Sequence, residues 1–167
     1  TRMSRKISTF IALLVFFAAV YLTPAKAAPA PDITAKNALV LNVENGFVLY
    51  AKKADKLIAP GPLVKLMTAM LSMENLSDLD EPVTAGANVY SGLKTYSAAK
   101  IKRGDVMTVR DYLCCLFVAD SGEAANVLAD RVSGGAGAFV DLMNRRAAEL
   151  GAKNTVFTNP HGEYDAA

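Results

Sequence analysis

One stretch of the sequence, residues 60–75, constrains the fold more than any other. Its apolar residues recur at intervals of three and four, which predicts an amphipathic helix with one face in a core. The predicted core face consists of Leu63, Leu66, Met67, Met70, Leu71 and Met73. Pro62 suits the first position of this helix, because proline has no N–H to leave unpaired there and its φ is already helical.

Lys65 follows Pro62 by three residues, so the two side chains are expected on the same face of the helix. Ser-x-x-Lys enzymes present a nucleophile and an activating lysine at this spacing, but the position of the nucleophile is proline here. On this stretch alone, Lys65 is better interpreted as a solvated charge on the surface of a helix.

The N-terminal residues have the pattern of a secretory signal peptide. Basic residues precede an apolar run over residues 7–22, and Ala25-Lys26-Ala27 is a small-residue cleavage site. We expect cleavage after Ala27 and an exported, extracytoplasmic protein; an uncleaved membrane anchor is the alternative. Residues 28–35 are rich in proline and alanine and are predicted to form a flexible lead-in.

The charge balance argues against nucleic acid as a partner. Residues 1–27 contain four of the 18 basic residues and none of the 16 acidic ones, which leaves 14 bases against 16 acids in the remainder. A net charge of −2 offers no basic surface for a phosphate backbone. Cys114 and Cys115 are adjacent in an apolar run, which favours small core residues over a disulfide or a metal site, and no cofactor is expected.

The remaining elements are predicted from turn residues, helix caps and periodicity. They are a hairpin of strands 38–43 and 47–51 around Asn45-Gly46, a helix capped by Thr108 that buries Tyr112, Leu113, Leu116 and Phe117, a break at 120–122, and helices over 123–132 and 139–150. Two Ser-x-x-Lys strings, at 91–94 and 97–100, open no helical pattern and are interpreted as chance. His161 is interpreted as a turn histidine bonded to backbone rather than a base.

The order of these pieces resembles a known family. The most specific stretch, residues 139–162, reads Phe-Val-Asp-Leu-Met-Asn-Arg-Arg-Ala-Ala-Glu-Leu-Gly-Ala-Lys-Asn-Thr-Val-Phe-Thr-Asn-Pro-His-Gly. It resembles the serine D-alanyl-D-alanine carboxypeptidases, the low-molecular-weight penicillin-binding proteins that trim peptidoglycan stem peptides. The resemblance covers nearly all of residues 36–165. It implies a β-lactamase-like α/β fold, an antiparallel sheet with a helical cluster, of which 36–167 would be the N-terminal part.

The resemblance also implies a mechanism and three motifs: Ser-x-x-Lys, Ser-x-Asn and Lys-Thr-Gly. In the family, serine attacks the D-Ala-D-Ala carbonyl, D-alanine leaves, and water hydrolyses the acyl-enzyme. Lys65 matches the lysine of the first motif and Pro62 its serine. The second motif places Asp120 at the serine and Gly122 at the asparagine, or, shifted by one, Ser121 and Glu123. The third motif would lie beyond Ala167.

These matches predict an exported, peptidoglycan-related protein whose catalysis is impaired. Its expected partners are a stem peptide or a β-lactam at the family site, with membrane contact only through the signal peptide or a C-terminal anchor beyond residue 167. The alternative is an active carboxypeptidase in which Pro62 is misreported or another nucleophile, of which Ser121 is the nearest, replaces it. We also predict that Asp120 and Lys65 form an ion pair at the old catalytic centre.

Overall fold

The computed structural model describes residues 29–164. They fall into two compact units, one ending at Lys56 and one beginning at Leu57. The predicted signal peptide, residues 1–27, lies outside the described residues and stays a prediction. So does the domain boundary at residue 36, although residues 29–35 contain no helix or strand.

The N-terminal unit contains the predicted hairpin, formed by β1 (Ala38–Leu41) and β2 (Val48–Lys52). The turn uses Gly46 at a φ of 71°, a conformation that glycine adopts without cost. The Asn42 side chain accepts from the N–H groups of Glu44 and Asn45, which closes the loop. No residue of either strand is fully buried.

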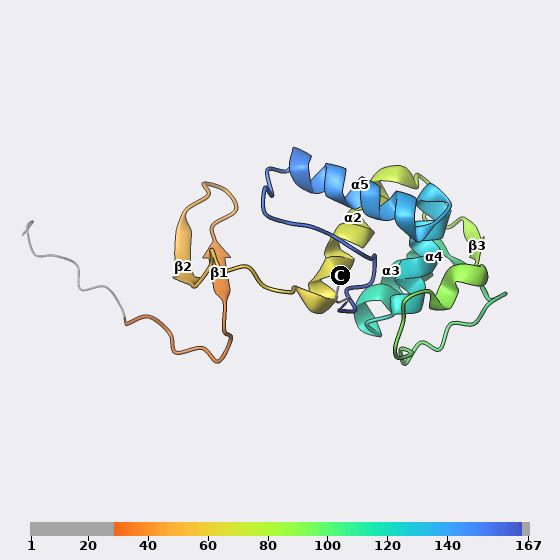
Figure 1. Ribbon diagram of the computed structural model, residues 1–167, viewed down its shortest axis with the longest axis horizontal. Coiled ribbons are helices and arrows are strands. Elements are labelled where there is room, and N and C mark those ends of the chain that lie inside the picture. Colours follow the sequence, from red (N-terminus) through yellow and green to blue (C-terminus); the bar gives the residue numbers. More distant parts are fainter. Residues whose placement is uncertain (1–28, 165–167) are drawn as a thin grey trace, which may run out of the picture. The chain divides into compact units, whose positions relative to one another are not determined.

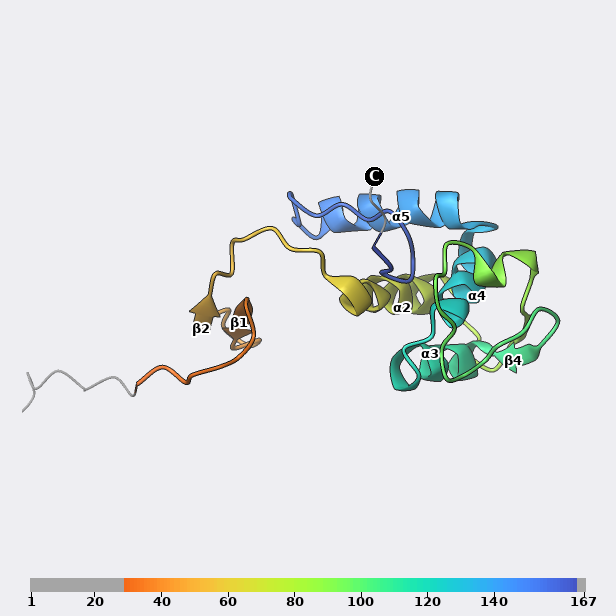
Figure 2. The same cartoon turned by 60° about the horizontal axis from the view of Figure 1, so that its bottom comes forward.

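The C-terminal unit is a helical cluster with a second small antiparallel sheet (Figure 1). Its helices are α2 (Val64–Asn75), α3 (Val109–Val118), α4 (Gly122–Ser133) and α5 (Ala136–Glu149), and its strands are β3 (Pro82–Thr84) and β4 (Val106–Thr108). Short 3-10 turns occupy Gly61–Leu63 and Ala87–Tyr90. Helix α4 packs against α2, α3 and α5, and every residue from Glu123 to Ala129 is buried (Figures 1 and 2).

The predicted core face of α2 is half right. Leu71 is buried and Met67 and Met70 are half-buried, whereas Leu63, Leu66 and Met73 are exposed. Pro62 lies in the 3-10 turn before the helix. The fully buried residues of the helix are Val64, Lys65, Thr68, Ala69, Leu71 and Ser72. Polar side chains can face inward here because they are hydrogen-bonded; the Thr68 hydroxyl donates to the Pro160 carbonyl at 2.6 Å, for example.

Helix α3 begins as predicted but presents a narrower face to the core. The Thr108 side chain accepts from the Asp111 N–H, and the Asp111 carboxylate accepts from the Thr108 N–H, which together form a capping box. Only Val109, Tyr112 and Leu116 are buried, with Leu113 and Cys115 half-buried against the core. The predictions that Phe117 and Cys114 are core residues are wrong: both are exposed, because α3 packs along a single stripe of its surface.

The last two helices match the sequence predictions closely. Helix α4 ends at Gly134, which has the left-handed φ of 74° typical of a C-cap. Helix α5 buries Phe139, Met143 and Ala147, while Leu150 lies at its end and is exposed. The Asn144 side chain bonds both backbone groups of Phe157, so the chain after α5 returns across the cluster toward α2.

Candidate active site

The residues matched to the family motifs meet around one cavity of about 220 Å³. Its walls come from the start of α2, the turn between α3 and α4, the loop before β4 and the segment after α5. They consist of Pro62, Lys65, Leu93, Thr95, Tyr96, Ser97, Ala119, Asp120, Gly122, His161, Gly162 and Glu163. The structure therefore brings Pro62, Lys65, Asp120 and Gly122 together.

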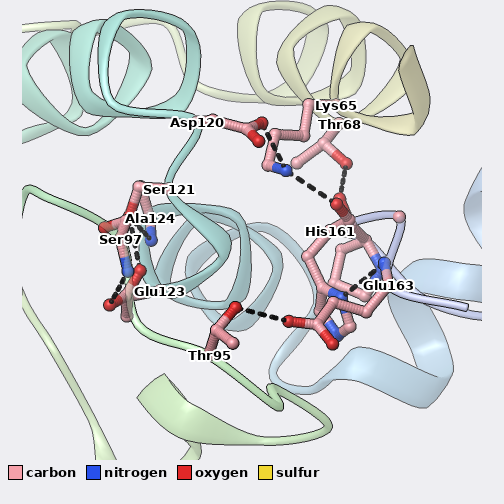
Figure 3. A network of polar contacts seen from close by, with 12 residues as sticks. Lys65, Thr68, Thr95, Ser97, Asp120, Ser121, Glu123, Ala124, His161 and Glu163 are labelled. Carbon is pink, nitrogen blue, oxygen red and sulfur yellow. Dashed lines mark hydrogen bonds and ion pairs between the residues drawn. The ribbon is translucent and has the colours of Figure 1, made fainter. Parts of the chain in front are cut away.

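An ion pair occupies the centre of this cavity. The Lys65 ammonium lies 2.8 Å from the Asp120 carboxylate and donates to the His161 carbonyl at 2.8 Å (Figure 3). The predicted ion pair is thus confirmed, whereas the interpretation of Lys65 as a solvated charge is wrong: its side chain is 6% exposed. A lysine that accepts a proton must present a free lone pair, whereas here the Lys65 Nζ lies within hydrogen-bond distance of two oxygens.

The turn that carries Asp120 places it against Lys65. Asp120 has a φ of 50°, a left-handed conformation that aspartate tolerates better than most residues. Asp120 and Gly122 both line the cavity, whereas Ser121 does not. The geometry therefore favours the alignment that puts Asp120 and Gly122, rather than Ser121 and Glu123, at the two ends of the second motif.

Ser121 has a structural role in this turn. Its hydroxyl accepts from the Ala124 N–H as the N-cap of α4, accepts from the Ser97 hydroxyl at 3.0 Å, and donates to Glu123 at 2.8 Å (Figure 3). Ser121 is fully buried. A hydroxyl with these three bonds and no access to the cavity is poorly placed to replace a nucleophile.

Glu123 is a buried acid at the start of α4. Burial alone would raise the pKa of its carboxyl, but hydrogen bonds from its own backbone N–H, Ser97 and Ser121 outweigh burial and hold the pKa below its ordinary value. Ser97, in a string interpreted as chance, donates both its N–H and its hydroxyl to this cluster.

A side chain at Gly122 would displace the side chain of Leu93. A Cβ at this position would lie 2.5 Å from the Leu93 Cδ2 atom. Leu93 therefore fills the space beside the position matched to the motif asparagine. No sequence pattern points to Leu93, because it is 29 residues from Gly122 and lies in an irregular loop.

The segment after α5 closes the cavity. His161 is buried, and its Nδ1 accepts from the Glu163 N–H at 3.2 Å, which confirms the interpretation as a turn histidine bonded to backbone. The Glu163 carboxylate accepts from the Lys94 N–H at 3.2 Å and from the Thr95 hydroxyl at 3.5 Å. Sequence reasoning missed Thr95 and Glu163, whose side chains meet across 68 residues.

Neither a metal site nor a membrane span is found in the part of the chain that the structure describes. Residues 29–164 contain no cluster of three or more histidine, cysteine or acidic side chains placed to bind a metal ion. Across the same residues, no helix is both long enough and apolar enough to cross a membrane.

Comparison with known proteins identifies the family of this site. A family model described as D-alanyl-D-alanine carboxypeptidase matches residues 24–166. The chain belongs to the D-alanyl-D-alanine carboxypeptidase family. The resemblance carried by the sequence motifs is thereby confirmed.

Curated members of the D-alanyl-D-alanine carboxypeptidase family align over most of this chain. It is 33% identical to the D-alanyl-D-alanine carboxypeptidase DacF of Bacillus subtilis over 77% of this chain and 33% of that protein. It is 35% identical to the D-alanyl-D-alanine carboxypeptidase of Streptomyces sp. strain K15 over 96% of this chain and 59% of that protein. The chain thus spans between a third and three-fifths of the length of these two relatives.

Solved structures of this family confirm the fold. The Streptomyces K15 DD-transpeptidase superposes with a TM-score of 0.76 at 31% identity, covering 84% of this chain and 57% of that one. Penicillin binding protein 6B of Escherichia coli gives a TM-score of 0.74 at 30% identity, covering 83% of this chain and 46% of that one. Penicillin-binding protein D2 of Listeria monocytogenes was solved in its ampicillin-bound form. It gives a TM-score of 0.67 at 32% identity, covering 83% of this chain and 56% of that one. The predicted penicillin-binding-protein fold of antiparallel sheet and helical cluster is therefore correct.

Proposed function

We propose that this protein is an exported member of the D-alanyl-D-alanine carboxypeptidase family that binds a peptidoglycan stem peptide or a β-lactam without serine acyl transfer. The single observation that carries the proposal is the 2.8 Å ion pair of Lys65 and Asp120 beside Pro62. In this reading the centre that performs acyl transfer in the family serves as a binding cavity.

The loss of acyl transfer follows from what each group can do chemically. Acylation needs an oxygen that attacks the carbonyl carbon and a base that takes its proton. Pro62 has no side-chain oxygen, and the protons of the Lys65 ammonium are bound by the Asp120 carboxylate and the His161 carbonyl. Both requirements therefore fail at the matched positions.

The polar wall of the cavity supports retained binding. Thr95, Ser97 and Glu163 line the cavity, so a peptide end would meet hydroxyl and carboxylate groups as well as the ion pair. A few convergent polar groups in a concave site are typical of ligand recognition. The ampicillin-bound relative from Listeria monocytogenes supports a β-lactam as a probe of this cavity.

Export is supported by the sequence pattern of residues 1–27, a basic start, an apolar run and an Ala-x-Ala site. An extracytoplasmic location would place the cavity where peptidoglycan is found. Sequencing the mature N-terminus of the secreted protein tests this part: we expect it to begin at Ala28.

The intact mass of the full-length protein after incubation with a penicillin tests the loss of acyl transfer. We expect no covalent adduct. An adduct would overturn the proposal in favour of the alternative, an active serine-type carboxypeptidase with another nucleophile, and peptide mapping of the adduct would identify that residue.

A titration tests the retained binding. We expect a peptide ending in D-Ala-D-Ala to bind the protein, and its diastereomer ending in L-Ala-L-Ala to bind at least about fivefold more weakly. Equal binding of both peptides, or binding of neither, would contradict a retained stem-peptide site.

A further inference from the structure

A second cavity adjoins the Lys65 cavity and shares two of its wall residues. Its volume is about 410 Å³, and Tyr96 and Ser97 line both cavities. The rest of its wall includes Tyr90, Lys100, Ile101 and Lys102. None of these four lines the Lys65 cavity, so the second cavity is a distinct candidate site.

Two tyrosine rings form one side of this second cavity. The rings of Tyr90 and Tyr96 meet edge to face, with centroids 5.2 Å apart and planes at 73°. Tyr96 is 70% exposed and Tyr90 is 38% exposed, so their surfaces are open to a ligand rather than packed in the core. Tyrosine combines an apolar ring with a hydroxyl, which suits a ligand that has both apolar and hydroxyl-bearing surface.

The accessible charge of the second cavity is positive. Lys100 and Lys102 are exposed, and neither forms an ion pair with any of residues 29–164. The wall's acidic residue, Glu123, is fully buried, and its carboxylate accepts from Ser97 and Ser121. A ligand entering the cavity would therefore meet two unpaired ammonium groups and no accessible carboxylate.

We propose that the second cavity binds a sugar ring that bears a carboxylate. The C–H surface of the ring would pack on Tyr90 and Tyr96, its hydroxyls would reach the tyrosine and Ser97 hydroxyls, and the carboxylate would bind Lys100 and Lys102. An aliphatic acid would contact mainly the two ammonium groups, and a neutral sugar mainly the tyrosine rings and the hydroxyls, so each would use only part of the wall. The site goes beyond the proposed function and does not depend on it.

A pair of matched ligands tests the charge requirement. N-acetylmuramic acid and N-acetylglucosamine share a ring and an acetamido group, but only the first carries a carboxylate. We expect chemical-shift titration of the full-length, isotope-labelled protein to show N-acetylmuramic acid binding at least about fivefold more tightly, with the shifts centred on Tyr96, Ser97 and Lys100. Equal binding of the two sugars, or binding of neither, would overturn the proposal.

Matched variants test the assignment of the lysines. The double variant Lys100→Ala/Lys102→Ala should bind both sugars equally. The control Arg145→Ala/Lys153→Ala, which removes two exposed cations elsewhere, should keep the preference for N-acetylmuramic acid. Retention of the preference in the first variant would overturn the assignment. Inorganic phosphate is the final comparison: if it binds the same residues as tightly as the sugar acid, the cavity is only a general anion site and the proposal fails.

The same variants separate this proposal from the proposed function. Lys100 and Lys102 lie outside the wall of the Lys65 cavity, so their replacement should leave the affinity for the D-Ala-D-Ala peptide unchanged. Failure of sugar binding alone would refute the second site, and failure of peptide binding alone would refute the stem-peptide site.

Discussion

At the scale of single residues, the proposed loss of acyl transfer gives Pro62 and Asp120 different parts. Pro62 has no side-chain oxygen to act as a nucleophile, and the Asp120 carboxylate lies 2.8 Å from the Lys65 Nζ. Restoring a serine at position 62 therefore supplies a hydroxyl but leaves the lysine paired with a carboxylate. Changing both residues supplies the hydroxyl and also releases the lysine from the carboxylate.

This separation predicts the behaviour of two variants toward penicillin. Pro62→Ser/Asp120→Ser should form the covalent adduct at least about tenfold faster than Pro62→Ser, because the Lys65 Nζ would no longer be bound by the Asp120 carboxylate. The time course of intact mass measures both rates. Asp120→Ser alone is the control and should form no adduct. Equal rates of adduct formation in Pro62→Ser and Pro62→Ser/Asp120→Ser would show that Asp120 does not restrain Lys65.

The contact between Gly122 and Leu93 predicts that substitutions at these two positions have coupled effects on stability. Gly122→Asn should lower the free energy of unfolding by about 1–3 kcal/mol, because its Cβ would lie 2.5 Å from Leu93 Cδ2 and the Leu93 side chain would have to move. Chemical denaturation measures the change. Gly122→Asn/Leu93→Ala should lose less than the sum of its two single variants.

A matched control exists for this substitution. Gly137 is also in the first turn of a helix, but a Cβ there would meet nothing within 4 Å. Gly137→Asn should therefore change stability much less than Gly122→Asn. Similar losses at both positions would mean that the contact with Leu93 is not the cause.

At the scale of elements, the junction of α3 and α4 depends on one buried carboxylate. Glu123 accepts from Ser97 and Ser121, and Ser121 in turn caps α4. The junction therefore joins the loop before β4 to the first turn of α4 and fixes the turn that carries Asp120.

The lowered pKa of Glu123 predicts a pH-dependent stability. A carboxyl whose pKa is lower in the folded protein than its ordinary 4.5 stabilises the fold above that value, and this contribution is lost as pH falls through the folded pKa. Glu123→Gln should cost roughly 1–3 kcal/mol at neutral pH and less in acid. Denaturant unfolding at both pH values measures this. The exposed Glu44→Gln should change stability little at either pH, and a Glu123→Gln loss that stayed constant with pH would contradict the prediction.

At the scale of the whole molecule, the two units differ in how much they bury. No residue of β1 or β2 is fully buried, whereas seven consecutive residues of α4 are. A two-stranded hairpin without a core is only marginally stable, because its amides open to water without disrupting packed side chains.

Hydrogen exchange of the full-length protein tests this difference. We expect the hydrogen-bonded amides of β1 and β2 to exchange at least about a hundredfold faster than those in the middle of α4, since local opening costs far less than global unfolding. Similar protection in the two elements would show that the hairpin is stabilised by packing against something else.

The sequence alone determined features that depend on neighbouring residues. The hairpin with Gly46, the N-cap of α3 at Thr108 and the approximate spans of α4 and α5 all follow from local hydrogen bonding and periodicity. The family and the residues matched to its first two motifs also came from the sequence. The Lys65–Asp120 pair was predictable because the motif match placed opposite charges at two positions known to meet.

Only the tertiary structure decided which surfaces face inward. The periodicity of α2 indicated an apolar core face, yet its Lys65 and Thr68 are buried because the carbonyls of His161 and Pro160 lie against them. In the same way, Leu93 lies beside Gly122, and the Thr95 side chain beside that of Glu163, only in the folded chain. These partners are 29 to 96 residues apart. Local pattern encodes hydrogen bonding along one element, whereas burial and the shape of a cavity depend on which distant segment supplies the opposing atoms.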